Sequence, residues 1–324
     1  MQYINLGKTG VKVSQLCFGT MSFGAEADEE MSGKMFHKCR DAGINFFDCA
    51  NVYSNGTAET YLGRLITGCR DKLVLTTKAY GPMGDDANAR GLSRRNIVTS
   101  VEASLQRLKT DRIDIYFAHK FDPDTDLEQT LYAFDDLVRS GKILYTAVSN
   151  WAAYQVATAL GISQKEKIAE FQCIQPMYNL AKRQAEVELL PLAETENLAV
   201  VPYSPLGGGL LTGKYGINKK PGTGRLLDVE FYNKRYSLAH YYETADRFAA
   251  HAGERGLAPA TLGVAWVMSH PTITAPIIGA RNLDQLQASL DAVNVEMTPE
   301  WRAEITALSV DPPPATDRLE ETLS

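Results

Sequence analysis

Short apolar runs alternate with amphipathic stretches along the chain. Each apolar run is followed by polar residues or glycine, which is typical of buried parallel strands that end in loops. This pattern predicts eight strands, which begin roughly 26 to 40 residues apart until a last gap of roughly 75. They are Gln15–Phe18, Asn45–Asp48, Leu73–Thr77, Ile113–Phe117, Tyr145–Ser149, Phe171–Gln175, Ala199–Pro202 and Thr274–Ile278.

The segments between these runs have the periodicity of helices. Ser93 is placed to cap a helix whose apolar stripe extends from Ile97 to Leu108. Asp126 is placed to cap another helix, which ends at Gly141. Because strands and helices alternate, we expect an α/β fold with a parallel sheet covered by helices. Eight repeats favour a closed (β/α)8 TIM barrel over an open doubly wound sheet.

Three segments lie outside this repeat. Residues 1–14 read as an N-terminal β-hairpin, and we expect it to cover the bottom opening of the barrel. Residues 207–236 form a long loop after the seventh strand, and loops of this length are usually binding loops or lids. Residues 312–324 are rich in proline and acidic residues and are predicted to be a mobile tail. We predict that residues 1–324 form a single barrel domain.

Composition narrows the class of protein. The net charge of −6 and the lack of a lysine or arginine run argue against nucleic acid. Neither a signal peptide nor an apolar stretch of the ~18 residues that span a membrane is present in the sequence. The five cysteines are scattered, which is typical of reduced thiols in the cytoplasm, and no histidine cluster suggests a metal. We expect a cytoplasmic protein that binds a small molecule, and the sequence indicates no particular oligomeric state.

Four residues at or just past strand ends form a candidate catalytic site: Asp48, Tyr53, Lys78 and His119. Parallel barrels bring such positions together at one face. A phenol has a pKa near 10, and a nearby ammonium lowers it. We therefore expect Lys78 to lower the pKa of Tyr53, with Asp48 holding the lysine and His119 bonding the phenol or a bound carbonyl oxygen. A purely structural Asp–Lys ion pair is the alternative.

Later strand ends carry groups that match a carboxamide. Ser149, Asn150 and Gln175 offer hydroxyl and amide groups, and Tyr203 offers a flat ring for stacking. Together they suit a nicotinamide, whereas each taken alone is as well explained by loop hydrogen bonding or packing. Four aromatic residues that closely follow strand ends are expected to wall the substrate pocket: Phe23, Tyr80, Phe121 and Trp151.

Two loops are candidates for binding phosphate groups. Gly208–Lys214 nearly matches the phosphate loop of nucleotide hydrolases, but Tyr215 replaces the magnesium-binding Ser or Thr, so we reject that function. Its backbone amides and Lys214 remain suited to a pyrophosphate. After the last strand, Arg281 has the fork geometry that phosphate favours, and a solvated arginine at a helix start is the alternative. No G-x-G-x-x-G follows an early strand, so a Rossmann site is unsupported.

These residues together resemble the aldo-keto reductase superfamily, in the branch of bacterial, plant and potassium-channel β-subunit proteins. The matching pieces follow one another in family order along nearly the whole chain. They are Gly19-Thr20-Met21, Asp48 to Tyr53, Gly56 with Glu59 and Gly63, Thr77-Lys78, Asp114-Ile115-Tyr116 with His119, Ser149-Asn150, Gln175 to Asn179, Tyr203 to Leu206, the Gly-Leu-Leu-Thr-Gly-Lys-Tyr loop and Gly279 to Asn282.

The resemblance implies a barrel that binds extended NADPH, with NADH the less favoured cofactor, and no metal. It implies Tyr53 as general acid, tuned by Lys78 and Asp48, with His119 orienting the carbonyl. Positions implied to surround the cofactor are Gly19, Thr20, Met21, Ser149, Asn150, Gln175, Tyr203, Ser204, Leu206, Gly208, Lys214, Gly279, Arg281, Gln285 and Ser289. The chain departs from the family pattern at Cys49, at Ser289 and at Lys120-Phe121-Asp122, the last of which borders the expected substrate pocket.

Our leading hypothesis is therefore an NADPH-dependent oxidoreductase that interconverts aldehydes or ketones, including sugar-type carbonyls, and alcohols. The first alternative is a redox-sensing or regulatory protein that binds NADPH on the same fold with little turnover. A metal-dependent sugar isomerase is a distant third, because carboxylates and histidines do not cluster at strand ends as such an enzyme needs.

Overall fold

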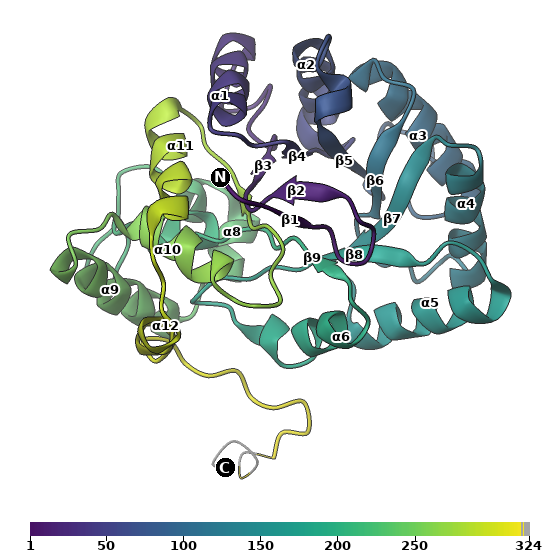
Figure 1. The fold of residues 1–324 in the computed structure, drawn as a ribbon. Coiled ribbons are helices and arrows are strands. Elements are labelled where there is room, and N and C mark those ends of the chain that lie inside the picture. Colours follow the sequence, from purple (N-terminus) through teal and green to yellow (C-terminus); the bar gives the residue numbers. More distant parts are fainter. Residues whose placement is uncertain (319, 321–324) are drawn as a thin grey trace.

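Eight parallel strands follow one another around a ring, and the last of them pairs with the first (Figure 1). The computed structural model describes residues 1–318 and 320 of the chain. The strands of the ring are β3 (Cys17–Gly19), β4 (Phe46–Asp48), β5 (Val74–Ala79), β6 (Ile113–Ala118), β7 (Ile143–Ser149), β8 (Phe171–Gln175), β9 (Ala199–Val200) and β10 (Ile277–Ile278).

The ring closes between β9 and β10 through separate hydrogen bonds. Thr274 N donates to Val200 O at 2.8 Å, and Ile277 N donates to Pro202 O at 2.8 Å. Both strands are shorter than predicted, because Pro202 and Pro276 have no N–H to give to a ladder. The prediction of a (β/α)8 barrel is confirmed.

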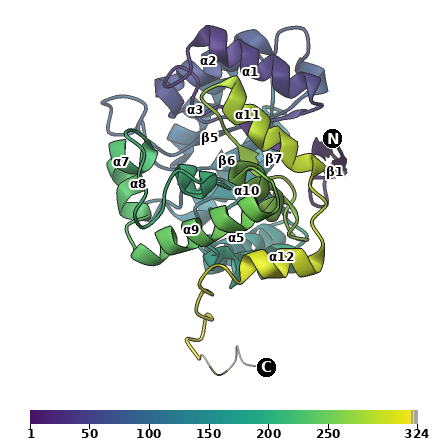
Figure 2. The same ribbon diagram turned by 90° about the vertical axis from the view of Figure 1, so that its left-hand side faces the viewer.

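Helices cover the outside of the ring (Figures 1 and 2). The predicted caps are present, since Ser93 Oγ accepts from Asn96 N at 3.3 Å and an Asp126 carboxylate oxygen accepts from Glu128 N at 2.8 Å. The helices that follow β3 to β8 in turn are α1 (Glu29–Asp41), α2 (Thr57–Leu65), α3 (Arg94–Leu108), α4 (Leu127–Arg139), α5 (Ala153–Glu166) and α6 (Leu189–Thr195).

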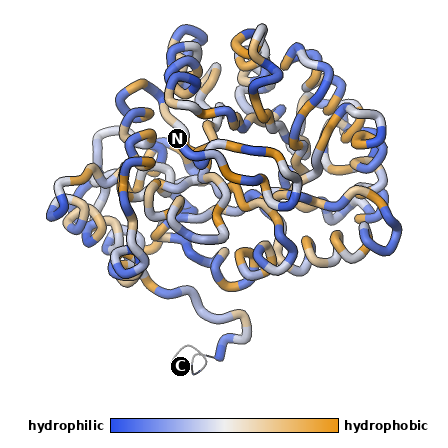
Figure 3. Tube along the Cα trace, in the orientation of Figure 1, coloured by the Kyte–Doolittle hydropathy of each residue, from blue (hydrophilic) through white to orange (hydrophobic). Residues whose placement is uncertain are grey.

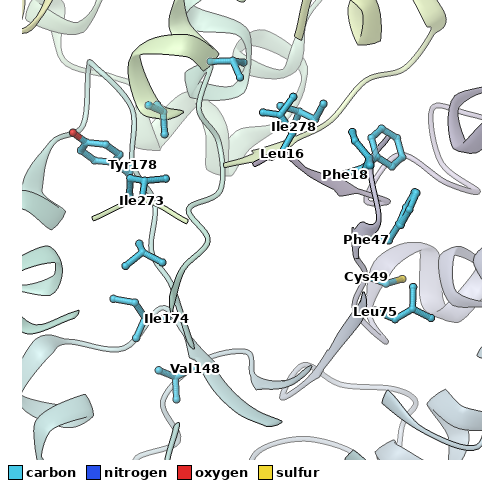
Figure 4. Packing of buried hydrophobic residues seen from close by; sticks show 14 of the residues in the cluster. Leu16, Phe18, Phe47, Cys49, Leu75, Val148, Ile174, Tyr178, Ile273 and Ile278 are labelled. Atoms are coloured by element: carbon cyan, nitrogen blue, oxygen red, sulfur yellow. The ribbon is translucent and has the colours of Figure 1, made fainter. Parts of the chain in front are cut away.

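Successive strand residues face opposite sides of the ring and build two apolar cores. Phe46 and Cys173 face inward with the smaller cluster, whereas Phe47 and Ile174 belong to the larger cluster between strands and helices. Figure 4 shows side chains of the larger cluster pointing away from the ring of strands. In Figure 3 the outer helices alternate between apolar and polar positions, as helices with one buried face should.

The N-terminal hairpin covers the bottom of the barrel, as the sequence predicts. Strand β1 (Tyr3–Asn5) pairs with the antiparallel β2 (Lys12–Ser14). Leu6 and Val13 belong to the inner core, and Ser14 N donates to Oδ1 of Asn45, just before β4 begins. The hairpin therefore leaves the opposite, C-terminal face of the barrel open for a site.

The connection from β9 to β10 is long because it contains several helices. Where the sequence predicts one long loop, the structure has the 3₁₀ helix η4 (Gly207–Thr212) and the short helices α7 (Arg225–Asp228) and α8 (Glu230–Arg235). After these come α9 (Ala239–Glu254) and α10 (Pro259–Met268). We call residues 207–236 the lid segment.

After β10 the chain forms α11 (Leu283–Leu290), η5 (Asp291–Asn294) and α12 (Pro299–Thr306). The described residues that follow α12 extend away from the barrel without an α-helix or strand (Figure 1). Residues 319 and 321–324 of the predicted tail lie outside the described residues, and its mobility stays a prediction. In the part of the chain that the structure describes, no helix is long and apolar enough to cross a membrane.

Candidate active site

The alternation of strand residues explains how the predicted site residues come together. Asp48 lies two positions after the inward-facing Phe46, and His119 lies two positions after Phe117. Side chains two apart in a strand share a face, so each of these residues continues the inward side toward the open end of the barrel. The same parity leads to Gly19, Lys78, Ser149, Gln175, Tyr203 and Gly279.

Asp48 and Lys78 form a buried ion pair. Nζ of Lys78 lies 2.7 and 2.6 Å from the two carboxylate oxygens of Asp48, and the two side chains are 0% and 3% exposed. Thr76 Oγ1 and Gln175 Nε2 also donate to Oδ1 of Asp48, at 2.7 and 2.9 Å. Burial alone would lower the pKa of Lys78, but its neighbours, Asp48 foremost, together outweigh burial and hold that pKa above its usual value. The ammonium is therefore charged at neutral pH.

Lys78 connects this pair to Tyr53. Its Nζ donates to the backbone oxygen of Cys49 at 2.6 Å and to the hydroxyl oxygen of Tyr53 at 3.5 Å. Because the lysine is the donor, the phenol keeps its own hydrogen. Among the described residues, no group accepts that hydrogen, and Tyr53 lines the large cavity at the open end of the barrel. The phenol is thus placed to donate into the cavity.

The pKa of Tyr53 shifts in the direction opposite to our sequence prediction. Lys78 lowers it as expected, but burial raises it more strongly and Asp48 adds to the rise, so the net pKa lies well above the usual value. The prediction of a net lowering is wrong, because one lysine shared with a carboxylate does not outweigh burial. Tyr53 is a neutral phenol at any pH near neutrality.

His119 is neutral as well. Burial and the charge of Lys78 lower its pKa to about 3. Its ring stands nearly perpendicular to that of Tyr53, with 6.2 Å between the ring centres. A neutral imidazole beside the phenol has one N–H donor and one nitrogen acceptor, so it can orient a bound oxygen but brings no ionised proton donor.

The loop that carries Tyr53 is held by contacts that sequence reasoning missed. Ser54 adopts a left-handed conformation with φ 47°, and its hydroxyl donates to Phe23 O at 2.7 Å. Glu59 is completely buried and accepts from Thr77 Oγ1 at 2.5 Å and from Arg107 Nε at 2.7 Å. The start of α2 is thereby fixed to β5 and α3, and Tyr53 with it. A buried Glu one helical turn into α2 had no visible partner in the sequence.

The predicted carboxamide group is already hydrogen-bonded within itself. Both hydrogens of the Asn150 amide are used, on His119 O at 2.9 Å and Ser149 Oγ at 3.0 Å. Oδ1 of Asn150 accepts from the Tyr203 hydroxyl at 2.7 Å, and Ser149 donates to Gln175 O at 2.9 Å. These bonds fix the Tyr203 ring over the strand ends and leave second lone pairs on the amide oxygens for a ligand.

A cavity of about 660 Å³ brings most predicted site residues together. Asp48, Tyr53 and His119 line it, while Lys78 lies buried beneath them. Of the predicted cofactor residues only Thr20 is not a lining residue; it is buried, and its hydroxyl donates to Asp48 O at 3.0 Å. The others all line it: Gly19, Met21, Ser149, Asn150, Gln175, Tyr203, Ser204, Leu206, Gly208, Lys214, Gly279, Arg281, Gln285 and Ser289.

The far end of the cavity is basic. Lys214, Arg225 and Arg281 all line it, and burial, together with the charges of the two arginines, lowers the pKa of Lys214. Glu26, which lies 199 residues before Arg225, bonds Nη2 of Arg225 at 2.9 Å and Nε of Arg281 at 3.3 Å. No sequence pattern connects positions so far apart, and neither Arg225 nor Glu26 was predicted.

The loop after β10 is organised as predicted. Asn282 caps α11 by accepting from Gln285 N at 3.0 Å, and Oε1 of Gln285 accepts from Arg281 N at 3.1 Å. Arg281 is thereby held at the start of the helix with its guanidinium toward the basic end.

Two of the four aromatic residues that we predict to wall the substrate pocket are buried. Phe23 is completely buried, and Trp151 is buried with its ring centre 5.5 Å from that of Phe171. Phe121 packs on Trp151 with 4.9 Å between centres, and Lys120 lies over the ring of Tyr80. None of these four aromatic residues is among the residues that line the large cavity. Distance along the chain from a strand end does not say which way a loop side chain turns, so their role as a substrate wall stays a prediction.

The lid segment supplies aromatic residues to the large cavity. Phe231, Tyr232 and Arg235 of α8 line it, and so does Met21 of the loop after β3. Gly208 has φ 68°, and a Cβ there would lie 2.9 Å from the Tyr232 ring. Glycine is thus required where α8 packs against η4 within the lid segment.

Comparison with known proteins agrees with this architecture. Residues 15–310 match the sequence model of the aldo/keto reductase family. The chain is 37% identical over 312 residues to the uncharacterized oxidoreductase YrpG of Bacillus subtilis, with 93% of each chain covered. It is 35% identical over 302 residues to a probable voltage-gated potassium channel subunit beta of Arabidopsis thaliana, covering 91% of this chain and 92% of that one. With protein tas of Escherichia coli it shares 31% identity over 338 residues, at 95% and 97% coverage.

Proposed function

The chain belongs to the aldo/keto reductase family, and from that premise we propose that it is an oxidoreductase that interconverts carbonyl compounds and alcohols with NADPH. The observation that carries this proposal is the bond from buried, charged Lys78 to the oxygen of Tyr53. It leaves the phenol's proton directed into a cavity that also collects amide and cationic groups. We propose Tyr53 as the general acid for reduction and as the corresponding base for oxidation.

The cavity fits a dinucleotide with several phosphate groups. At the basic end its lining contains the cations Lys214, Arg225 and Arg281. Its lining carboxylates are Asp48, which is already paired with Lys78, and Asp284. Excess positive charge in a cleft attracts phosphates, and arginine forks bind them in two-pronged fashion. Among these cations, Arg281 is our candidate for the 2′-phosphate that distinguishes NADPH from NADH.

Lone pairs and a ring at the strand ends suit the nicotinamide. Oxygens of Gln175 and Asn150 keep acceptor capacity for a carboxamide N–H, and the Tyr203 ring is fixed in orientation by its bond to Asn150. When bound, the reduced nicotinamide supplies the hydride for the carbonyl carbon. Ser149, Asn150, Gln175 and Tyr203 therefore serve to hold it at the end of the barrel that contains Tyr53.

The chain's own residues then handle the substrate oxygen. His119, being neutral, orients the oxygen through its N–H, and Tyr53 gives its proton as negative charge develops there. A raised phenol pKa does not prevent this transfer, because an alkoxide is far more basic than a phenolate. Lys78 stabilises the phenolate that remains and is itself held by Asp48.

The second candidate function is regulation through NADPH binding with little turnover. It is favoured by the relatives whose names describe them as potassium channel β subunits. In either case we propose a single barrel domain. The five cysteines are unpaired thiols, and we propose a cytoplasmic location on that basis.

Replacing Tyr53 with phenylalanine tests the proposal. The ring and its packing remain, but the proton donor is lost, so we expect kcat for aldehyde reduction to fall by roughly 10²- to 10⁴-fold. NADPH affinity, measured by fluorescence titration, should stay within about twofold. Tyr132→Phe is the control, since this exposed phenol on α4 lies outside the cavity.

Two outcomes would count against the proposal. A Tyr53→Phe variant with most of its kcat would remove Tyr53 as the acid. A wild-type protein that binds NADPH tightly but turns over no aldehyde, ketone or keto sugar in a broad screen would favour the regulatory function.

A further inference from the structure

Arg235 is a cation of the cavity that the cofactor does not account for. It is the last residue of α8, is partly buried, and lines the same cavity as Tyr53, His119 and Tyr203. In the sequence it carried no predicted role. Lys234, the residue before it in α8, has an acidic partner instead. It bonds the Glu230 carboxylate at 2.8 Å on the outer surface and does not line the cavity.

The guanidinium of Arg235 is held by aromatic rings. Its Cζ lies 5.3 Å from the ring centre of Phe231 and 5.3 Å from that of Tyr232. Tyr232 is buried against Gly208, so this platform is fixed to η4. Stacking on rings fixes the guanidinium plane but leaves its N–H donors unused.

No acidic partner neutralises this charge. Over residues 1–318 and 320, no carboxylate lies within 4.0 Å of Arg235, and no hydrogen bond of its side chain is present. By contrast, Arg225 and Arg281 share Glu26 at the basic end. A partly buried arginine with free donors and no counter-ion is set up to bind an anion.

The position of Arg235 separates it from the phosphate-binding end. Arg235 is followed directly by Tyr236, whose hydroxyl accepts from Asn179 Nδ2 at 3.1 Å, and Asn179 lies four residues after Gln175. Consistent with this position, burial raises the pKa of Tyr203 and the charge of Arg235 opposes that rise, whereas burial and the charges of Arg281 and Arg225 lower the pKa of Lys214. Tyr203 belongs to the end of the cavity that carries Tyr53 and His119. At this end Asp48 is paired with Lys78 and His119 is neutral, so Arg235 provides the net positive charge.

We propose that Arg235 binds an anionic substituent of the substrate, so that the enzyme prefers aldehydes or ketones that carry a carboxylate or a phosphate. This inference rests on the proposed reduction and names its substrate class. Arg235 determines specificity and takes no part in the transfer of the hydride or proton. The lid segment thus recognises the charged end of the substrate while the strand ends act on its carbonyl.

The test compares pairs of related aldehydes in which one member carries the anionic group and the other is neutral. For the carboxylate arm we would use 4-carboxybenzaldehyde and its methyl ester, and for the phosphate arm glyceraldehyde 3-phosphate and glyceraldehyde. The variants are Arg235→Met, which keeps length and packing, Arg235→Lys, which keeps the charge, and Lys234→Met, which makes the same change in net charge on the outer side of the same helix.

We expect Arg235→Met to reduce the ratio of kcat/KM for the anionic substrate to kcat/KM for its neutral partner by roughly 10- to 100-fold in at least one arm. A change of this size is expected when a hydrogen bond to a charged group is lost. The arm that responds identifies the anion. Arg235→Lys should recover part of the ratio, Lys234→Met should leave it unchanged, and NADPH affinity should stay within about twofold in all three. An unchanged ratio in both arms, or an equal loss of NADPH affinity, would overturn the inference.

A binding measurement separates this inference from the proposed reaction. Calorimetric titration of the NADPH-loaded protein with 4-(hydroxymethyl)benzoate and with glycerol 3-phosphate needs no turnover, and the methyl ester and glycerol are the neutral partners. Weaker binding of an anion, but not of its neutral partner, in Arg235→Met supports Arg235 as its site even if no aldehyde is reduced. Equal binding of the anions by wild type and Arg235→Met would reject it, whether or not the protein reduces carbonyls.

Discussion

At one end of the cavity Lys78 is completely buried and bonded to Asp48, whereas at the other end Lys214 is exposed and lies near two arginines. The first lysine stands on a strand and touches charges that are fixed by the barrel. The second stands on the lid segment, and the arginines near it share a single carboxylate, Glu26. The buried Lys78–Asp48 pair balances its charges internally, while the cations around Lys214 keep an excess of positive charge.

This difference matches two chemical tasks. A proton donor needs neighbours whose charges stay constant during the reaction, and burial within a bonded network provides that. A site for a ligand with several negative charges needs cations that have no full complement of carboxylate partners in the free protein, because the ligand then neutralises them. These cations must remain accessible to the ligand. Removing the lysine should therefore lower the stability of the fold at the buried end and the affinity for NADPH at the exposed end.

Lys78→Met should have the largest effect, because it leaves the buried Asp48 carboxylate without its cation. We expect a loss of about 3–5 kcal/mol in the free energy of unfolding, measured by urea denaturation. Lys214→Met, the matched change at the exposed end, should alter stability by about 0.5 kcal/mol or less and weaken NADPH instead.

A double variant guards against a general packing defect at position 78. Asp48→Asn combined with Lys78→Met removes the stranded charge and should regain part of the lost stability. If Lys78→Met were as stable as Lys214→Met, the contrast between a balanced buried end and an exposed binding end would fail.

Arg281→Ala should have an intermediate effect that is confined to the cofactor. We expect the dissociation constant of NADPH to rise by roughly 10- to 100-fold and that of NADH by much less, because only NADPH carries the 2′-phosphate. Fluorescence titration with both cofactors measures the ratio, and kcat at saturating NADPH should change little. Equal weakening of both cofactors would remove Arg281 from the 2′-phosphate.

The smallest effect concerns pH. Since the pKa of His119 is lowered to about 3, the folded imidazole is already neutral at pH 6.5, where a free imidazole titrates. The kcat for a neutral aldehyde should then show no inflection near pH 6.5. As the pH falls below 6.5, His119 binds a proton in the unfolded chain but stays neutral in the folded chain until about pH 3. The contribution of His119 to stability is therefore fully present above pH 6.5 and is lost progressively as the pH falls from 6.5 to about 3.

Unfolding curves of His119→Asn test this direction. Removing the depressed imidazole should make the fall in stability between pH 6.5 and 4 shallower than in the wild type, while His37→Asn, at an exposed position of α1, should leave the slope unchanged. A steeper fall in His119→Asn, or an inflection in kcat that it abolishes, would mean that His119 ionises in the folded protein.

Most of the barrel and the reactive end follow from local patterns. Apolar runs such as those around Phe46 and Leu75 predict buried strands. Because side chains alternate between the two faces of a strand, Asp48 and Lys78 point to the same side of the barrel wall. Caps at Ser93, Asp126 and Asn282 were predictable because a cap depends on residues three positions away. The lengths of β9 and β10 were overestimated, because prolines interrupt the ladder of backbone hydrogen bonds there.

The parts that the sequence missed depend on contacts between distant residues. The direction of the Tyr53 pKa depends on burial by many segments, and the positions of Phe23 and Trp151 depend on how their loops turn. Arg235 could be recognised as unpaired only when the surroundings of α8 were known.

The sequence by itself determined the closed parallel barrel, the face on which the site lies, and the identity of the residues that face it. These three features follow from the alternation of side chains along a strand and the periodicity of helices, which depend only on residues close in the sequence. Only the tertiary structure decided that Tyr53 stays protonated, that Glu26 pairs with Arg225 and Arg281, and that Arg235 has no counter-ion in the part of the chain that the structure describes. Burial and long-range charge are sums over neighbours brought from the whole chain, and no local pattern contains them.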